Sequence, residues 1–199
     1  MKILIGTPTY DRRIDIELVR LFVHLERECK AHSFDYMFPV SSHLSRNRNY
    51  VCQVALESGH DAVLFLDSDI AIEDHAFIEN LVEIAYKHDA GIVGGAYRAK
   101  KDDYMLVAGN FKDGESDNLT KLPSDPTEVD YVGTGIMLIM RKVLVDMPEP
   151  HFTIVDKPGL KVMPEDYEFC RKAKEKGVKI MLDPRFKTQH YGAFGWPTF

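Results

Sequence analysis

The feature that most constrains this sequence is a run of five apolar residues, Ala62 to Leu66, that ends directly on Asp67-Ser68-Asp69. A short apolar run bounded by polar residues is typical of a strand buried in a parallel sheet. The two carboxylates then follow the carboxyl end of that strand, where open α/β sheets bind their ligands. Neighbouring carboxylates repel each other unless a cation or a hydrogen-bond donor lies nearby, and Mg²⁺ is usually held by one or two carboxylates plus substrate phosphates. The pattern predicts a metal–diphosphate site, and the alternative is a turn and cap before a helix near Asp74.

The first hundred residues alternate between strand-like and helix-like segments. Strands are predicted at 3–5, 34–40, 62–66 and 91–94, and helices at 14–25, 44–58 and 74–88. This alternation predicts right-handed βαβ crossovers and a mostly parallel sheet flanked by helices. Beyond residue 100 we expect an antiparallel segment at 104–111 and a surface loop or hairpin at 112–128. A long strand at 131–140 is interrupted by Gly133 and Gly135, which indicates close approach of backbone or ligand. A helix opened by Pro164 as a first-turn proline and ended near Lys176 follows, with final strands at 178–182 and 186–190.

Composition excludes several classes of protein. The 199 residues suffice for one domain with a sound core, and the net charge of −6 argues against a nucleic-acid surface. Cys29, Cys52 and Cys170 are too few and too widely spaced for a disulfide framework or a zinc site, so a reducing compartment is expected. The longest later apolar stretch, Ile136 to Met140, is far too short to span a membrane. We therefore expect a cytoplasmic protein without a transmembrane segment.

Basic residues cluster after the predicted strands. They follow the first, second and fourth strands as Arg12 and Arg13, Arg46 and Arg48, and Arg98, Lys100 and Lys101. All should lie at the carboxyl edge of the sheet beside the two aspartates. A guanidinium suits a diphosphate because it makes two directed hydrogen bonds to oxyanions. The alternative is that these loops carry solvated charge. The turn Gly6 to Tyr10 lacks a dinucleotide fingerprint, and the chain has no Walker A loop.

Two further features are candidates for chemistry. Glu165-Asp166 opens the helix at Pro164, where acidic residues are also favoured by the helix dipole and as caps. The dipole should keep Asp166 ionised, which suits a base but weakens its affinity for a proton. His190 follows a polar strand and needs a partner close in space to act as a metal ligand.

Seven motifs together resemble a GT-A fold glycosyltransferase of the family 2 kind, over nearly the whole chain. In order they are Thr7-Pro8-Thr9-Tyr10, Ser45 to Asn49, Asp67-Ser68-Asp69, Gly94 to Arg98, Val132 to Gly135, Glu165-Asp166 and His190. The resemblance implies a GT-A (Rossmann-like) α/β fold, with residues 1–100 as the nucleotide-binding half and 101–199 as the acceptor and catalytic half. The compact chain resembles the small, soluble bacterial or viral members.

The resemblance also implies roles for individual residues. The donor site would be formed by Thr7, Pro8, Thr9, Tyr10, Arg12, Arg46, Asn49, Asp67, Ser68, Asp69 and Gly133. Asp69 and His190, with Asp67, would bind Mn²⁺ or Mg²⁺ on the diphosphate, and Asp166 would be the base of an inverting reaction. The loop 102–128 and the aromatic residues Tyr191, Phe194 and Trp196 are candidates for acceptor binding.

The function implied is metal-dependent transfer of a hexosyl or deoxyhexosyl group from a nucleotide-sugar, expected to be a UDP-sugar, to a hydroxyl of a glycan or other acceptor. The Gln-x-x-Arg-Trp motif of processive synthases is absent, which favours a single addition. Two other classes stay open. A haloacid-dehalogenase-like phosphohydrolase also uses Asp-x-Asp, but Ala71 stands where it would want Thr or Val. A non-catalytic nucleotide-sugar-binding module would tolerate loss of Asp166.

Overall fold

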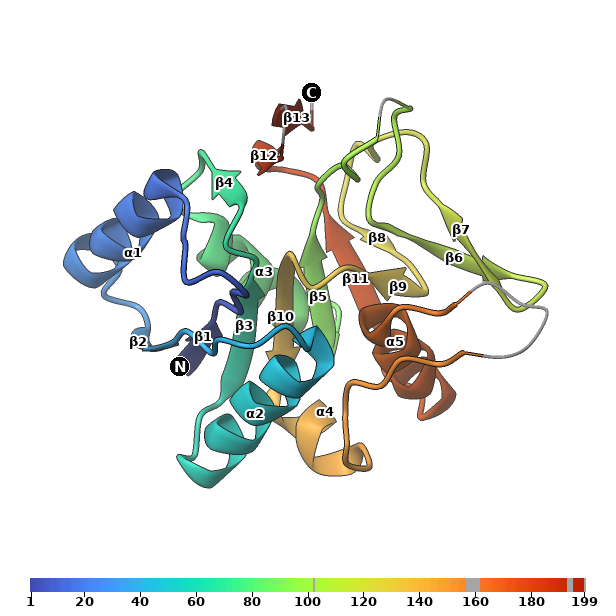
Figure 1. The fold of residues 1–199 in the computed structure, drawn as a ribbon, viewed down its shortest axis with the longest axis horizontal. Helices are drawn as coiled ribbons and strands as arrows, with labels where there is room; N and C mark the ends of the chain where they lie inside the picture. Colours follow the sequence, from blue (N-terminus) through green and yellow to red (C-terminus); the bar gives the residue numbers. More distant parts are fainter. Residues whose placement is uncertain (102, 157–161, 193–194, 199) are drawn as a thin grey trace.

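A seven-stranded sheet forms the centre of the molecule (Figure 1). The computed structural model describes residues 1–101, 103–156, 162–192 and 195–198. In spatial order the strands are β2 (Ser33–Met37), β1 (Lys2–Gly6), β3 (Ala62–Leu66), β10 (Ile136–Met140), β5 (Ile92–Gly95), β11 (Ile180–Asp183) and β8 (Thr127–Glu128). Five of them point the same way, while β10 and β8 run antiparallel to their neighbours. The expected mostly parallel α/β sheet is confirmed.

Helices cover both faces of the sheet (Figure 1). On one face, α1 (Ile16–Glu28) and α3 (Phe77–Lys87) share a buried apolar core, and on the other α2 (Leu44–Glu57), α4 (Arg141–Asp146) and α5 (Glu165–Glu175) share a second. Strand β3 lies between the two cores. Val63 and Phe65 point into one core, and Ala62, Leu64 and Leu66 point into the other. Because both faces of β3 are buried, its sequence is apolar throughout rather than alternating.

Two small sheets stand at the edges of the central one. β4 (Ile70–Ile72) pairs with β12 (Thr188–Tyr191), which also pairs with β13 (Gly195–Pro197). β6 (Ala108–Lys112) forms a hairpin with β7 (Glu115–Asn118) and also pairs with β9 (Tyr131–Val132). The hairpin spans 108–118, so it combines the end of the expected antiparallel segment 104–111 with only the first part of 112–128, where a surface loop or hairpin was expected. The three-residue strand β4 and the short helix α4 were not predicted, because each is too short for its periodicity to be recognised.

The segment 131–140 forms two strands in different sheets, where one strand interrupted by two glycines was predicted. It breaks at Gly133-Thr134-Gly135, so that β9 joins the hairpin sheet and β10 joins the central sheet. Helix α5 begins one residue later than predicted. Pro164 is its N-cap and does not belong to its first turn. Of the aromatic candidates near the end of the chain, Phe194 and the side chain of Trp196 lie outside the described residues.

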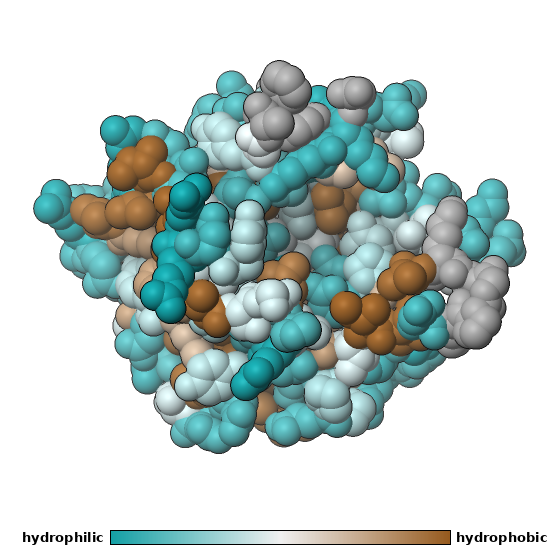
Figure 2. All heavy atoms as spheres, viewed as in Figure 1, coloured by the Kyte–Doolittle hydropathy of each residue, from teal (hydrophilic) through white to brown (hydrophobic). Residues whose placement is uncertain are grey.

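The face of the molecule seen in Figure 2 is largely hydrophilic, with an apolar patch over α1 where Ile16, Val19 and Val23 are exposed. Among the described residues, no helix combines the length and apolar character needed to cross a membrane. Cys29, Cys52 and Cys170 are free thiols, and the last two are buried.

Candidate active site

The tripeptide Asp67-Ser68-Asp69 forms the turn between β3 and β4. Its backbone is fixed from two sides. The N–H of Asp67 donates to the carbonyl of Gly135 at 3.1 Å, and the N–H of Tyr191 donates to the carbonyl of Asp69 at 2.8 Å. Neither aspartate caps α3. The N-cap of α3 is Ala76, and Asp74 accepts from the N–H of Ala76 at 2.9 Å in the turn before the helix. Both carboxylates are therefore available for other partners at the carboxyl edge of the sheet.

His190 lies beside Asp69 because β12 pairs with β4 in a register that sets His190 opposite Ile70. The Nδ1 atom of His190 is 2.8 Å from the carbonyl oxygen of Arg98. A carbonyl can only accept, so Nδ1 carries the proton. In the neutral ring Nε2 then presents its lone pair, and it faces Oδ1 of Asp69 at 3.5 Å. A backbone carbonyl that fixes the histidine tautomer in this way is the usual support of a metal-ligating histidine.

The other carboxylate oxygen of Asp69 is paired with the ammonium group of Lys100. Burial raises the pKa of Asp69, but hydrogen bonds from the protonated form of the His190 ring and from Lys100 outweigh burial and hold the pKa below its usual value. Asp69 is thus ionised at neutral pH, as a metal ligand must be.

Arg48 is the basic residue that the structure brings to the acidic turn. Its side chain lies on the inner face of α2 and only 3% of the residue is exposed. One guanidinium nitrogen, Nη2, is 3.3 Å from Oδ1 of Asp67, and Nη1 forms an ion pair with Oε1 of Glu165. Sequence analysis grouped Arg48 with the other loop cations. The signal that distinguishes it is its position three residues before Val51 and four before Cys52, on the apolar side of the helix.

Arg46 and Asn49, which the family resemblance assigned to the nucleotide, line a hollow on α2. Residues two positions apart on a helix are rotated by about 200° about its axis. Arg46 and Arg48 therefore project from opposite sides of α2. The hollow that Arg46 and Asn49 line has a volume of about 980 Å³ and lies between α2, the segment 149–151 and the segment 39–42, which pairs with Thr9. The carboxamide of Asn49 also bonds the backbone of Phe152 twice, at 2.8 and 2.9 Å. Its polar atoms therefore already hold the chain that follows α4.

Asp166 lies in the first turn of α5 and is 9% exposed. One carboxylate oxygen accepts from the N–H of Tyr167 at 2.9 Å, and the other accepts from the N–H of Thr134 at 3.3 Å. Burial raises the pKa of Asp166, and the opposing effects of Arg48 and these two N–H groups only partly offset it. The helix dipole alone would lower the pKa of this carboxylate, but desolvation outweighs the dipole. A raised pKa improves Asp166 as a proton acceptor near neutral pH.

The side chain of Tyr97 packs so close to Gly133 and Gly135 that neither position has room for a larger residue. Its hydroxyl accepts from the N–H of Gly135 at 3.0 Å, and its ring packs edge-on against His190 with centroids 5.3 Å apart. A Cβ atom on Gly133 or on Gly135 would lie less than 3.0 Å from atoms of Tyr97. The close approach that these glycines predicted is thus to the ring of a tyrosine. Neither Tyr97 nor Thr134 was singled out by sequence analysis, although both lie within quoted motifs.

Gly133→Ala is expected to lower the free energy of unfolding by about 1–3 kcal/mol, the usual cost of overpacking a filled core. The new methyl group would meet the Tyr97 hydroxyl oxygen and Cγ1 of Val107. Urea unfolding measures the change. Tyr97→Phe removes the oxygen, so it should cost less in the Gly133→Ala background than in the wild-type background. Strictly additive losses would contradict this assignment of the steric contact.

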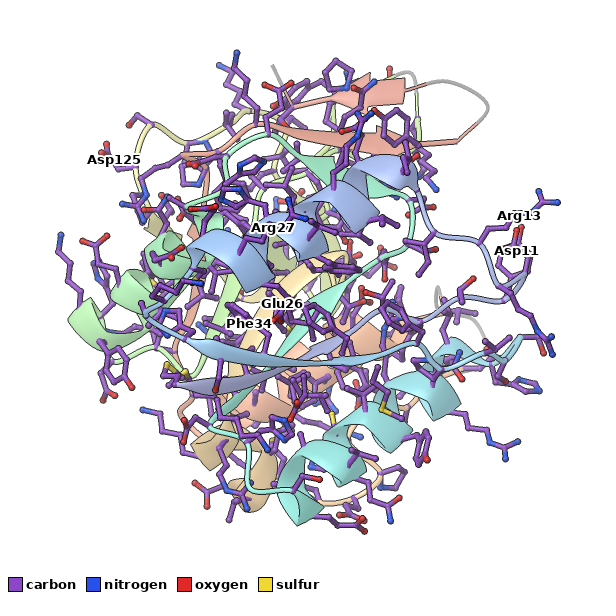
Figure 3. All side chains as sticks on the ribbon, turned by 90° about the vertical axis from the view of Figure 1, so that its left-hand side faces the viewer. Asp11, Arg13, Glu26, Arg27, Phe34 and Asp125 are labelled. Atoms are coloured by element: carbon purple, nitrogen blue, oxygen red, sulfur yellow. The ribbon has the colours of Figure 1, made fainter. Side chains whose placement is uncertain are left out.

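In the turn Thr7 to Tyr10, the only side chain that is largely exposed to solvent is the ring of Tyr10. Thr7, Pro8 and Thr9 are buried, whereas Tyr10 is 77% exposed. The N–H groups of Thr7 and Thr9 donate to Met37 and Pro39, which extends the pairing of β1 with the chain after β2. Arg12 is exposed and has a positive φ of 64°. Figure 3 shows the flanking Asp11 and Arg13 at the tip of this loop, directed away from the body of the molecule.

Residues from both halves of the chain therefore meet at one edge of the sheet: Arg48, Asp67, Asp69, Lys100, Tyr97, Thr134, Glu165, Asp166 and His190. Across the described ranges, no group of three or more His, Cys, Asp or Glu residues forms a complete metal cage. Asp69 and His190 instead make a pair of protein ligands, which suits a cation completed by substrate oxygens.

Comparisons with known proteins identify the family and the fold. Residues 10–195 match the family model described as glycosyltransferase like family 2. No curated protein sequence matches the chain. Among solved structures, A197 from STIV is similar, with a TM-score of 0.72, 21% identity, and coverage of 96% of this chain and 86% of that one. A putative glucose-1-phosphate thymidylyltransferase from Bacillus anthracis, solved in complex with a sucrose, has a TM-score of 0.54 and 13% identity, with 95% of this chain and 88% of that one covered. At these identities the structures show a shared fold.

Proposed function

Because this chain belongs to the glycosyltransferase-like family 2 and has a GT-A fold, we propose that it transfers one sugar from a nucleotide-sugar to an acceptor hydroxyl. The observation that carries the proposal is the convergence of Asp69 and His190 with the buried carboxylate of Asp166 at one edge of the sheet. In this proposal residues 1–100 bind the donor, with the nucleotide against Thr7 to Tyr10, Arg12 and Ser68 and a UDP-sugar as the expected donor. Residues 101–199 supply the acceptor side, including the loop 102–128 and Tyr191.

The donor atoms of Asp69 and His190 fit a divalent cation. A carboxylate oxygen and an imidazole lone pair face each other at 3.5 Å, and a cation between them would relieve their repulsion. Asp69 and His190 would hold Mn²⁺ or Mg²⁺, with Asp67 next to them in the same turn. Such a cation, when bound, offsets negative charge that develops on the departing diphosphate. Lys100, which pairs with Asp69, is placed to add a second positive charge there.

Asp166 is proposed to take the proton of the acceptor hydroxyl as that oxygen attacks the anomeric carbon. Burial raises the pKa of this carboxylate, and Thr134 and Tyr167 hold both of its oxygens through backbone N–H groups. These contacts fix its orientation without neutralising it. Attack from the face opposite the diphosphate would invert the configuration at the anomeric carbon.

The two other classes of function are less well supported. The family match gives no support to a phosphohydrolase, since it assigns the chain to a transferase family. A non-catalytic nucleotide-sugar-binding module would not need a buried carboxylate with a raised pKa, which is an energetically costly feature usually found at functional sites.

A thermal-shift screen of nucleoside diphosphates and nucleotide-sugars, each with Mn²⁺, tests the proposal first. The correct donor should stabilise the protein by about 2.7 kcal/mol at a hundredfold excess over its dissociation constant. That donor is then incubated with a panel of hydroxyl acceptors, and release of the nucleoside diphosphate is measured. The proposal fails if no nucleotide-sugar raises the melting temperature. Stabilisation without transfer to any acceptor would favour the binding module.

A further inference from the structure

Arg48 connects the two halves of the site described above. We infer that Arg48 is a positioning residue that holds the donor-side Asp67 and the start of α5 in a fixed relation, and thereby places Asp166. The inference rests on the proposed function, because it assigns these two carboxyl groups to opposite sides of one reaction.

The contacts come from three separate elements. Arg48 lies on α2, Asp67 follows β3, and Glu165 is the first residue of α5, 117 positions away in sequence. Two different nitrogens of one planar group bind the two carboxylates, so the group fixes a distance and an angle between them. Asp166 is the next residue after Glu165 on the helix. The ion pair at Glu165 therefore limits how far Asp166 can move relative to the Asp67 turn.

The charges show why a cation is needed at this point. Asp67, Glu165 and Asp166 bring three carboxyl groups to one region, and Asp67 and Asp166 interact unfavourably with each other. Without Arg48, repulsion would push the turn and the start of α5 apart. The buried guanidinium offsets this repulsion through Asp67 and Glu165, and among the described residues Asp166 has no ion pair of its own.

The energetics argue against stability as the main reason for this arrangement. When an ion pair is buried, the free energy of hydration that the two charges lose is often as large as the free energy that their attraction supplies. Apolar residues of similar size therefore often give equal or greater stability. The Nε atom of Arg48 is also buried and has no hydrogen-bond partner, which adds a further cost. A residue that is kept in this costly state is better explained by the geometry that it imposes on its partners.

The experiment compares Arg48→Lys, Glu165→Gln and the double variant with wild type in transfer kinetics. Lysine keeps the charge but cannot bind both carboxylates through a planar fork, and glutamine keeps the shape but weakens a charge-assisted bond. Arg48→Lys should lower kcat by about 10–100-fold, the usual effect of losing a residue that orients a site. Glu165→Gln should cost less, and the double variant should lose no more than Arg48→Lys alone, because the two residues act as one unit.

The pair Arg20 and Glu17 provides the matched control. It is an ion pair of the same residue types, but it is exposed on α1. Arg20→Lys and Glu17→Gln should leave kcat within a small factor of wild type. A purely structural role for Arg48 predicts a different result: a lower melting temperature in Arg48→Lys, with the kcat of the folded protein unchanged. That result, or losses that multiply in the double variant, would overturn the inference.

Failure of the proposed function gives a different pattern. If wild-type protein transfers no sugar, the inference is judged by calorimetry of UDP with Mn²⁺ on wild type and on Arg48→Lys. A fall in affinity of about 10–100-fold supports the positioning role, and equal affinities overturn it. If Arg48→Lys does not fold, Glu165→Gln provides the same comparison, since it retains Arg48 and its contact with Asp67.

Discussion

Asp166→Asn is expected to lower kcat for sugar transfer by about 10²–10⁴-fold, the contribution that a positioned general base typically makes. Asparagine has nearly the same shape and its oxygen can accept one of the two backbone N–H bonds, from Thr134 or Tyr167. It cannot take up the proton of the acceptor. The affinity for the donor should stay within a small factor of wild type, as measured by calorimetry. Full transfer activity in this variant would rule out the proposed mechanism.

The stability of the same variant separates a catalytic role from a structural one. Burial raises the pKa of Asp166 in the folded protein, so the folded state binds its proton more tightly than the unfolded chain does. The stabilising contribution of this group is therefore complete below the unfolded pKa and is lost as pH rises through the folded pKa. At neutral pH the carboxylate favours unfolding. We expect Asp166→Asn to melt at or above the wild-type temperature at pH 7, whereas loss of a useful helix cap would lower it.

The pH dependence of wild-type kcat follows from the same shift. The base must be ionised to act, so turnover should fall on the acid side with a midpoint above 3.8, the ordinary pKa of an aspartate. Asp166→Asn should lose this acid limb along with most of its activity. If the residual kcat of the variant still fell at acid pH with the same midpoint, a group other than Asp166 would be responsible for the pH dependence.

Asp69→Ala and His190→Ala are the second pair of variants with large expected effects. Each removes one of two proposed ligands, so Mn²⁺-dependent donor binding should fall by more than the roughly 10–100-fold that loss of a supporting residue costs. Neither side chain belongs to the apolar cores, so both melting temperatures should stay near wild type in the absence of metal. The measurement is donor affinity titrated against Mn²⁺.

Asp146→Ala, an exposed aspartate at the end of α4, is the control for this pair. It should leave the dependence on Mn²⁺ unchanged. If Asp69→Ala and His190→Ala also bind the donor with wild-type dependence on Mn²⁺, the metal assignment is wrong.

Local sequence was sufficient for the elements whose signal lies within a few residues. The apolar run 62–66 predicted a strand buried in the sheet, with the acidic turn at its carboxyl end, and β3 confirms the strand. The order of motifs along the chain was likewise sufficient for the family, which the match over residues 10–195 confirms. These conclusions hold because burial, periodicity and motif order are properties of contiguous sequence.

Tertiary structure alone decided which residues meet. His190 lies beside Asp69 because β4 pairs with β12 across more than a hundred residues. Arg48 rather than Arg46 contacts Asp67 because of the rotation of α2, and Tyr97 divides the segment 131–140 by filling the space above two glycines. The pKa of Asp166 depends on the water excluded around it, while sequence indicates only its helix dipole. Register, helix rotation and desolvation are set by packing between distant segments, and no local pattern specifies them.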